Sequence, residues 1–317
     1  MRGLLQKNAW TLGLASLLLL LLAATKLIQP DFGASGLDSL ARAALPFALA
    51  TCGMAIVVIA GGIDLSVAAM MAVASVSAAV LMTGSADEGA FGVVAIVLVI
   101  GLGMGTINGL LVVLTRVPDI VVTLAMLYVW GGVALLILNA PGGGAAPMLR
   151  ALIVGGLPGI EGLPRALVAL ALAALVIWWP IRRSRLGLML YATGSDKLAA
   201  YRSGVPIGPV KVFSYAVAGL FAALGGLSVT LSTGIGEPIP GPYLLASVAA
   251  VVLGGVSLAG GKGGLLGPIL AVFVLRLVRM DLTLMRVDPN VTTIVEGSIM
   301  VAVVMFGGLM ALRGQRK

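Results

Sequence analysis

The chain has 317 residues, of which 60% are hydrophobic and only 10% are charged, and this composition excludes a soluble domain because so much apolar surface could not be buried. The net charge of +8 comes from basic residues in the connections between apolar segments, which membrane topology explains better than nucleic-acid binding, so no nucleic-acid partner is expected. The lack of histidine excludes His-dependent zinc sites and Ser-His-Asp triads, and the single cysteine, Cys52, excludes an intrachain disulfide.

Apolar runs long enough to cross a bilayer follow one another along the whole chain. Roughly ten spans are predicted, at Leu12–Ile28, Ala43–Ala60, Ser66–Met82, Val93–Leu114, Ile120–Leu138, Ala166–Trp179, Val212–Leu231, Leu244–Leu258, Leu265–Leu277 and Thr292–Met310. The runs are continuous rather than alternating, and the 44 glycines suit closely packed membrane helices. The sequence therefore predicts an all-α, multi-pass membrane protein with one transmembrane domain over residues 1–317.

An even number of spans places both termini on the same side of the membrane. The connections on that side hold Arg2, Lys7, Arg116, Arg182, Arg183, Arg185, Lys197, Arg202, Lys211, Lys262, Arg313, Arg316 and Lys317. Most of the acidic residues lie in the opposite connections. The positive-inside rule then predicts that both termini are cytoplasmic.

The first polar motif lies between the second and third spans. Its residues are Gly61, Gly62, Ile63, Asp64, Leu65 and Ser66. Capping of the next helix is the simplest role for Asp64, since it needs only one backbone donor. Binding of a coupling ion would need further polar partners, and none are nearby in the sequence.

Three polar residues inside predicted spans are candidates for a transport pathway or for helix packing, because polar groups are costly in lipid. They are Asn108, Thr123 and Glu296. For Asn108, a hydrogen bond between two helices is favoured over a pathway role. For Glu296, an ion pair with Arg276 or Arg279 is favoured over contact with a solute.

The longest polar segment runs from Pro180 to Lys211. Ser195 is placed to cap a short helix over Asp196–Ser203, and Gly204 is placed for a left-handed stop. A short, capped, basic helix on the cytoplasmic side is suited to docking a soluble partner. The alternative is a solvated basic loop that only fixes topology.

A weak internal echo links two segments that are far apart in the chain. The residues VVIAGGIDLS (Val57–Ser66) are similar to AVVLGGVSLA (Ala250–Ala259), and each places a Gly-Gly pair at the cytoplasmic end of a span. The similarity suggests a duplication. The following GGKGG (Gly260–Gly264) lacks the spacing of a phosphate-binding loop and is interpreted as a tight turn.

Five motifs, in this order, resemble the permease subunits of bacterial ABC importers of the ribose, xylose and galactose type. The motifs are GGIDLSV (Gly61–Val67), TINGLLV (Thr106–Val112), PDIVVTLAM (Pro118–Met126), YATGSDKLAAYRSGV (Tyr191–Val205) and SVAAVVLGGVSLAGGKGGLLGP (Ser247–Pro268). The chain departs from the family pattern at Ala68–Ala69, where many relatives have Gly-Ser, and at Ser195, where they often have asparagine. It also departs at Leu244–Ser247, where many relatives carry acids. These departures leave open whether the permease pairs with itself or with a second, different permease.

The resemblance implies a non-catalytic permease in a bacterial inner membrane that carries a small polar solute inward, and a monosaccharide is the expected solute. Its expected partners are a cytoplasmic ABC ATPase that binds ATP and magnesium, a periplasmic solute-binding protein, a second permease and membrane lipid; no cofactor is expected in this chain itself. The resemblance also implies ATPase coupling by Ser195, Asp196, Lys197, Leu198, Ala199, Ala200, Tyr201, Arg202, Ser203 and Gly204.

Three other functions remain open. An ion-coupled secondary transporter would use Asp64 and Glu296. An ABC importer could instead carry a sugar-like signal or a branched-chain amino acid. A membrane-embedded enzyme is disfavoured by the absence of histidine and of clustered acids.

Overall fold

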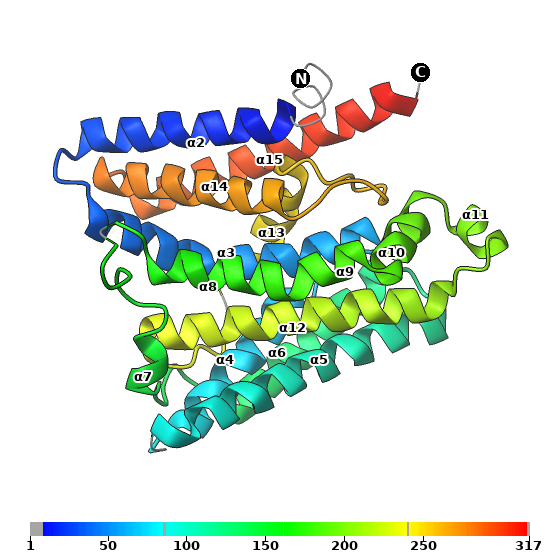
Figure 1. Cartoon of the computed structure of the whole chain (residues 1–317), viewed down its shortest axis with the longest axis horizontal. Coiled ribbons are helices and arrows are strands. Elements are labelled where there is room, and N and C mark those ends of the chain that lie inside the picture. Colours follow the sequence, from blue (N-terminus) through cyan, green and yellow to red (C-terminus); the bar gives the residue numbers. More distant parts are fainter. Residues whose placement is uncertain (1–8, 85–86, 161, 240, 316–317) are drawn as a thin grey trace.

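A computed structural model describes residues 9–84, 87–160, 162–239 and 241–315, and these residues form a bundle of helices without a strand (Figure 1). Each predicted span overlaps a helical segment. The segments are α2 (Ala9–Ile28), α3 (Ala34–Ile59), α4 (Val67–Met82), α5 (Ala90–Thr115), α6 (Asp119–Ile137), α8 (Arg165–Ala173) continued by η2 (Ala174–Trp178) and α9 (Trp179–Arg183), α12 (Ile207–Thr233), α13 (Tyr243–Leu253), α14 (Leu266–Leu284) and α15 (Pro289–Gln315). The short helices between them are η1 (Asp87–Gly89), α7 (Pro147–Arg150), α10 (Arg185–Ser195) and α11 (Lys197–Arg202).

Six of these segments are long and apolar enough to cross a membrane, counting only the described residues: α2, α3, α5, α6, α8 to α9, and α12. The helices α4 and α13 are also apolar but shorter. Because a helix rises about 1.5 Å per residue, α13 is much too short to cross a hydrocarbon core of about 30 Å by itself. The fold is therefore a multi-pass membrane bundle that contains at least one half-length helix.

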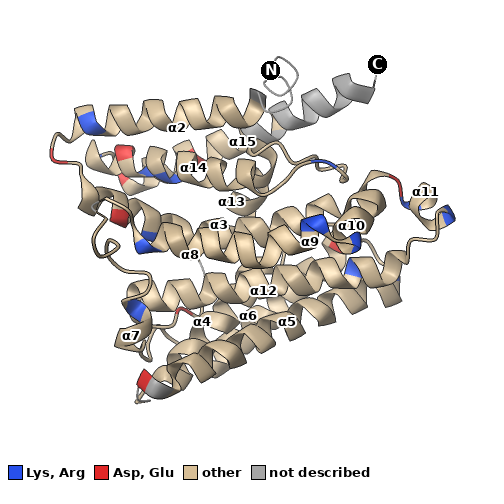
Figure 2. Cartoon of the chain, viewed as in Figure 1, with Lys and Arg blue, Asp and Glu red and all other residues tan. Residues whose placement is uncertain are grey.

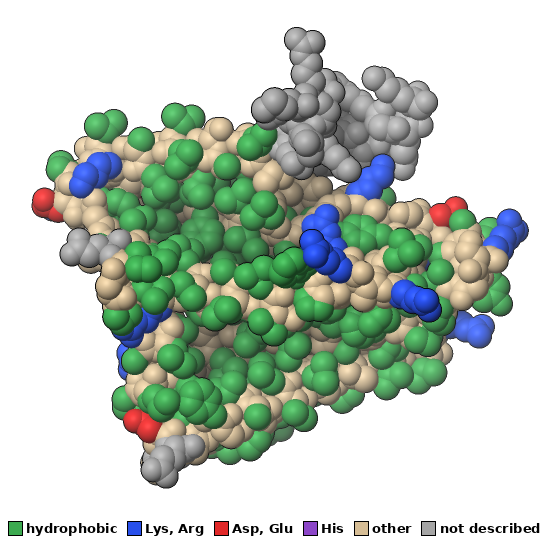
Figure 3. All heavy atoms as spheres, viewed as in Figure 1, with side chains coloured by type: hydrophobic (Ala, Val, Ile, Leu, Met, Phe, Trp, Pro, Cys, Tyr) green, Lys and Arg blue, Asp and Glu red, His purple; other side chains and the backbone are tan. Residues whose placement is uncertain are grey.

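The bundle has two ends, named here the α11 end and the α7 end after the short helices that mark them (Figure 1). The basic residues of α9 to α11 gather at the α11 end, and the visible surface between the two ends is mainly hydrophobic (Figures 2 and 3). The start of α2 and the end of α15 both point toward the α11 end (Figure 1). Arg2, Lys7, Arg316 and Lys317, which the topology prediction used, lie outside the described residues.

The centre of the bundle is formed by α3, α4 and α12. Most of α3 is buried, and in α4 every residue is buried except Val80 and Leu81. These helices are apolar around their whole circumference, which is the pattern of a helix that has no exposed face. As a result α4 is enclosed by its neighbours over almost its entire length.

Close packing of α5 against α12 depends on glycines spaced four residues apart. Gly101 and Gly105 on α5 lie against Gly219 and the backbone of Tyr215 on α12. A Cβ atom on Gly105 would collide with the Tyr215 carbonyl oxygen, and one on Gly219 would lie 2.8 Å from the Gly105 nitrogen. This close approach is the role that the glycine content predicted.

Several predicted boundaries are wrong, and charged residues are the reason. α3 begins at Ala34 instead of Ala43 because Asp38 and Arg42 form an ion pair of 2.8 Å one turn apart. α14 continues to Leu284, since the Arg276 guanidinium lies over aromatic rings instead of in a loop. Charges predicted to mark connections therefore lie within helices.

Candidate functional site

The polar segment after α9 folds into two helices where one was predicted. The Ser184 hydroxyl caps α10, accepting from Gly187 N, and α10 then continues through Ser195. Because Ser195 is itself helical, the prediction that it caps the next helix is wrong. The cap of α11 is Asp196, whose Oδ1 accepts from Leu198 N (2.9 Å) and Ala199 N (3.0 Å).

The predicted left-handed stop after α11 is confirmed. Gly204 has a φ of +81°, and its nitrogen donates to Tyr201 O. Ala200 is buried against the bundle, whereas Leu198 and Tyr201 are 58% and 71% exposed. The short helix thus presents two large side chains away from the protein, and exposed apolar residues of this kind favour contact with a partner.

The α10 helix is fixed to the bundle by backbone contacts between glycines. Gly194 lies against Gly61 and Gly260, and a Cβ atom on Gly194 would collide with Ile59 O and lie 2.6 Å from Gly261 N. Gly261 N in turn donates to Ile59 O (2.9 Å). These residues from three separate segments form what is here called the glycine junction.

A side-chain hydrogen bond supports the same contact. The Tyr191 hydroxyl on α10 donates to Gly263 O (2.7 Å). Burial raises the pKa of this phenol, so the group remains protonated and can donate. The residues Gly260–Gly264 form the tight turn that was predicted, with left-handed φ angles at Gly260 and Gly261.

The two segments of the sequence echo end their helices in the same way. Gly61 (φ +77°) follows α3 and Gly255 (φ +81°) follows α13, each in the left-handed region. Gly62 N donates to Val57 O and Val256 N donates to Val251 O, the long-range bond typical of a Schellman turn. The structural match is offset by one residue from the sequence match, since Gly61 corresponds to Gly255 and not to Gly254.

Asp64 is buried in a network that extends from the loop to α5 and α6. Its Oδ1 accepts from Ser66 N (2.9 Å) and Ser66 Oγ (2.6 Å), which closes a turn before α4 instead of capping the helix itself. Asn108 Nδ2 donates to Ser66 Oγ (2.6 Å), and Asn108 Oδ1 accepts from Trp130 Nε1 (3.1 Å). Asn108 thus joins helices, as its packing interpretation predicts.

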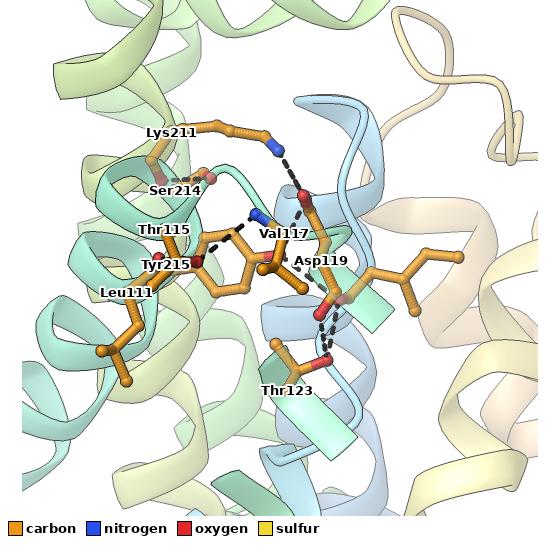
Figure 4. A network of polar contacts seen from close by, with 9 residues as sticks. Leu111, Thr115, Val117, Asp119, Thr123, Lys211, Ser214 and Tyr215 are labelled. Carbon is orange, nitrogen blue, oxygen red and sulfur yellow. Dashed lines mark hydrogen bonds and ion pairs between the residues drawn. The ribbon is translucent and has the colours of Figure 1, made fainter. Parts of the chain in front are cut away.

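A second set of polar contacts lies on the other side of the same loop (Figure 4). Thr123 Oγ1 accepts from Leu65 N (3.1 Å), so Thr123 is also brought to the loop. Lys211 Nζ on α12 lies 2.5 and 2.6 Å from the carboxylate oxygens of Asp119 on α6. The Tyr215 hydroxyl donates to Asp119 Oδ2 (3.0 Å) and points toward the same carboxylate (Figure 4).

Asp119, Lys211 and Tyr215 were not among the predicted site residues. Asp119 and Lys211 begin apolar spans, so each resembles an ordinary boundary charge. The available signal was the motif at Pro118–Met126, which contains Asp119 beside Thr123. Together with Asp64, Ser66 and Asn108, these residues surround the loop 61–66, here called the loop network.

Glu296 lies apart from the loop network. It pairs with Arg279 (3.1 Å) between α15 and α14, and the predicted ion pair is therefore confirmed. A joint role of Asp64 and Glu296 at one ion site has no support in this arrangement.

Comparison with known proteins identifies relatives that match nearly the whole length of this chain. A family model described as "Branched-chain amino acid transport system / permease component" matches residues 36–304. The ribose import permease protein RbsC of Escherichia coli (strain K12) is 29% identical over 304 residues, which cover 94% of each chain. RbsC of Bacillus subtilis (strain 168) is 31% identical over 307 residues, covering 96% of this chain and 93% of that one.

A further relative differs in its named solute. The autoinducer 2 import system permease protein LsrD of Photorhabdus temperata is 26% identical over 317 residues, covering 94% of this chain and 91% of that one. No solved structure matches the chain. The matches confirm the resemblance that the five motifs predicted.

Proposed function

The chain belongs to the family of branched-chain amino acid transport system permease components, and from this premise we propose that it carries a monosaccharide inward across a bacterial inner membrane. The relatives named as ribose import permeases support a sugar. The relative named for autoinducer 2 import makes a sugar-like signal the alternative, and the family description leaves a branched-chain amino acid as another.

The observation that carries the proposed mechanism is the position of α11. This helix exposes Leu198 and Tyr201 between Lys197 and Arg202, and it connects through α10 to the glycine junction. We infer that α11 docks in a groove of a cytoplasmic ATPase, which supplies ATP and magnesium. Closure of two ATPase subunits would then move α10 and, through Gly194, the loop network.

The same proposal fixes the orientation of the protein. With the α11 end in the cytoplasm, the basic residues of α9 to α12 satisfy the positive-inside rule, and both termini are cytoplasmic. The α7 end then faces the periplasm, where a solute-binding protein delivers the solute. A second permease, either a copy or a paralogue, completes the pathway, and the whole chain acts as one permease domain with its coupling segment at residues 180–211.

The first experiment is purification of the tagged protein from its native membrane in mild detergent, followed by mass spectrometry. We expect an ABC ATPase to co-purify, with or without a second permease. Recovery of the protein alone, together with uptake into liposomes driven only by an ion gradient, would contradict the proposal and support a secondary transporter.

A second experiment tests the docking helix by itself. Leu198→Ser combined with Tyr201→Ser changes only exposed side chains, so the permease is expected to insert and fold normally but to lose the ATPase on purification. Met285→Ser is the matched control, since Met285 is 60% exposed at the other end of the molecule. Retention of the ATPase by the double variant would show that α11 is not the docking helix.

A further inference from the structure

A small cavity with several polar side chains in its wall lies on the α7-end side of the loop network. Its volume is about 160 Å³, and it lies between α4, α12 and the connection that leads into α13. Ser75, Thr233, Glu237 and Tyr243 contribute polar groups to its wall, and Met71 is among the apolar residues that line it. This volume equals the share of roughly five water molecules in the liquid and is below that of drug-sized sites. It suits a single small molecule.

The position of the cavity in the fold is typical of a transport site. It lies where α4 and α13 meet, and these two short apolar helices adjoin the Gly-Gly turns of the internal echo. In many transporters, short or discontinuous spans form the solute site. Ser66 in the loop network directly precedes α4, and Ser75 lies further along this helix. The cavity is thus joined to the loop network by one buried helix.

The Glu237 carboxylate is available to a ligand. Its backbone nitrogen donates to Ser75 Oγ (3.1 Å), which holds the connection against α4. Ser75 Oγ is itself bonded to Thr230 Oγ1 (2.8 Å). Within the described ranges, no residue makes a hydrogen bond or ion pair with the carboxylate of Glu237. A half-buried carboxylate that lines a cavity without a partner is an acceptor for the hydroxyl groups of a ligand.

The remaining walls suit the rest of a sugar molecule. The Tyr243 ring is held in place by the Arg276 guanidinium, 5.8 Å from its centroid, and by Phe47 at 6.3 Å. Such a ring, together with Met71, offers an apolar surface to the C–H groups of a sugar. The Thr233 hydroxyl adds a further polar group beside Glu237.

A larger cavity, on the side of α3 and α8, has a different chemistry. It measures about 790 Å³ and is lined mainly by apolar side chains, including residues of α3, α5, α7, α8 and α12, with Arg165 and Ser228 as its polar residues. Walls of this kind suit lipid chains rather than a sugar, so the smaller cavity is the better candidate for a polar solute.

We propose that this cavity is a transit site for one polyhydroxylated solute, in which Glu237 accepts hydrogen bonds from the solute hydroxyls and Tyr243 contacts its C–H face. The inference rests on the proposed import of a monosaccharide and assigns its recognition to residues of the permease. A carboxylate would reject a solute that carries a negative charge, which predicts selectivity for neutral sugars over sugar phosphates.

The first test is uptake by the assembled importer carrying Glu237→Gln, which keeps the side-chain size but removes the charge. The maximal uptake rate is expected to fall about tenfold, because hydrogen bonds to a charged group are stronger than neutral ones. The apparent KM is expected to stay the same, since the external binding protein captures the solute. Glu237→Asp should restore part of the rate. Asp31→Asn, at an exposed acid in a loop outside the cavity, is the control.

The second test is protection of an introduced thiol. Cys52 is fully buried, so the native chain provides a silent background for a methanethiosulfonate reagent. Thr233→Cys places a thiol in the cavity wall, and Thr293→Cys is the matched control, because both threonines are exposed and bond the carbonyl four residues earlier. Ribose, xylose or galactose at millimolar concentration is expected to slow labelling at residue 233 but not at residue 293.

The outcomes separate this inference from the proposed function. The tests use a preparation in which the ATPase has co-purified and sugar uptake is measured, so the importer itself is already established. Normal uptake by Glu237→Gln would overturn the transit site while leaving the importer intact. Loss of uptake without protection at residue 233 would overturn it too, because Glu237 would then act on something other than the solute.

Discussion

The Lys211 ammonium group contacts both carboxylate oxygens of Asp119, at 2.5 and 2.6 Å, although the two residues are 92 positions apart. Both side chains are largely buried, with exposed fractions of 9% and 15%. The pair ties the first turn of α6 to the first turns of α12 and lies beside the loop 61–66. It therefore fixes the α11 end of the bundle at the place where the coupling segment rejoins it.

Removing only one partner of this ion pair should lower the stability of the protein much more than removing both partners. Lys211→Met leaves the Asp119 carboxylate buried without its cation, and we expect a loss of about 3 kcal/mol in stability. Adding Asp119→Asn should recover much of that loss. Thermal unfolding of the detergent-solubilised variants measures both effects, and a double variant that is less stable than Lys211→Met would contradict this account.

The glycine contact between α5 and α12 predicts that alanine substitutions at two nearby glycines change the stability differently. Gly105→Ala should destabilise the protein by about 1–3 kcal/mol through overpacking against Tyr215. Gly103→Ala, whose Cβ atom would meet nothing within 4 Å, should be neutral or stabilising by up to about 1 kcal/mol. Unfolding temperatures measured side by side test the difference, and equal effects at both positions would rule out close packing as its cause.

The glycine junction predicts a defect in coupling. Gly194→Ala introduces a Cβ atom that collides with Ile59 O, so α10 must move away from the loop 61–66. Uptake is expected to fall at least tenfold while the ATPase still co-purifies, because α11 itself is unchanged. Gly92→Ala is the control, since its Cβ atom has no neighbour within 4 Å. Unchanged transport by Gly194→Ala would show that the junction transmits nothing.

Asp64 is expected to act through its hydrogen bonds and not through its charge. Asp64→Asn keeps the Oδ1 acceptor for Ser66, so uptake should remain within about threefold of the native rate. Asp64→Leu removes the acceptor and leaves Ser66 N buried, which should cost about 1–3 kcal/mol. Stability and uptake are measured for both. Complete loss of transport in a folded Asp64→Asn variant would favour an ion-coupling role instead.

The sequence was a good guide to the helices because each span is an uninterrupted apolar run. It was a poor guide to their ends, since a charged residue inside a helix looks the same as one in a connection. Asp38 and Arg42 neutralise each other on α3, and Arg276 on α14 lies over Phe47 and Tyr243. Both cases depend on neighbours that only the folded chain supplies.

The site was foreseen only in part. Asn108 and Thr123 were identified because a polar residue inside an apolar span is conspicuous, and both lie at the loop 61–66. Asp119, Lys211 and Tyr215 were missed because their importance comes from mutual contact across distant parts of the chain. Ser195 was misassigned because two residues in succession can cap a helix, and the extent of α10 decides between them.

The enclosure of α4 has a consequence for how the protein is made. A ribosome completes α4 long before α12, which covers one side of it, and α13, which contacts it near the α7 end. Until α12 is inserted, Ser75 lacks its hydrogen-bond partner Thr230 and faces lipid or the insertion machinery. We expect nascent chains that stop before residue 207 to be held by insertion factors or degraded, because the centre of the bundle closes only when the second half of the chain arrives.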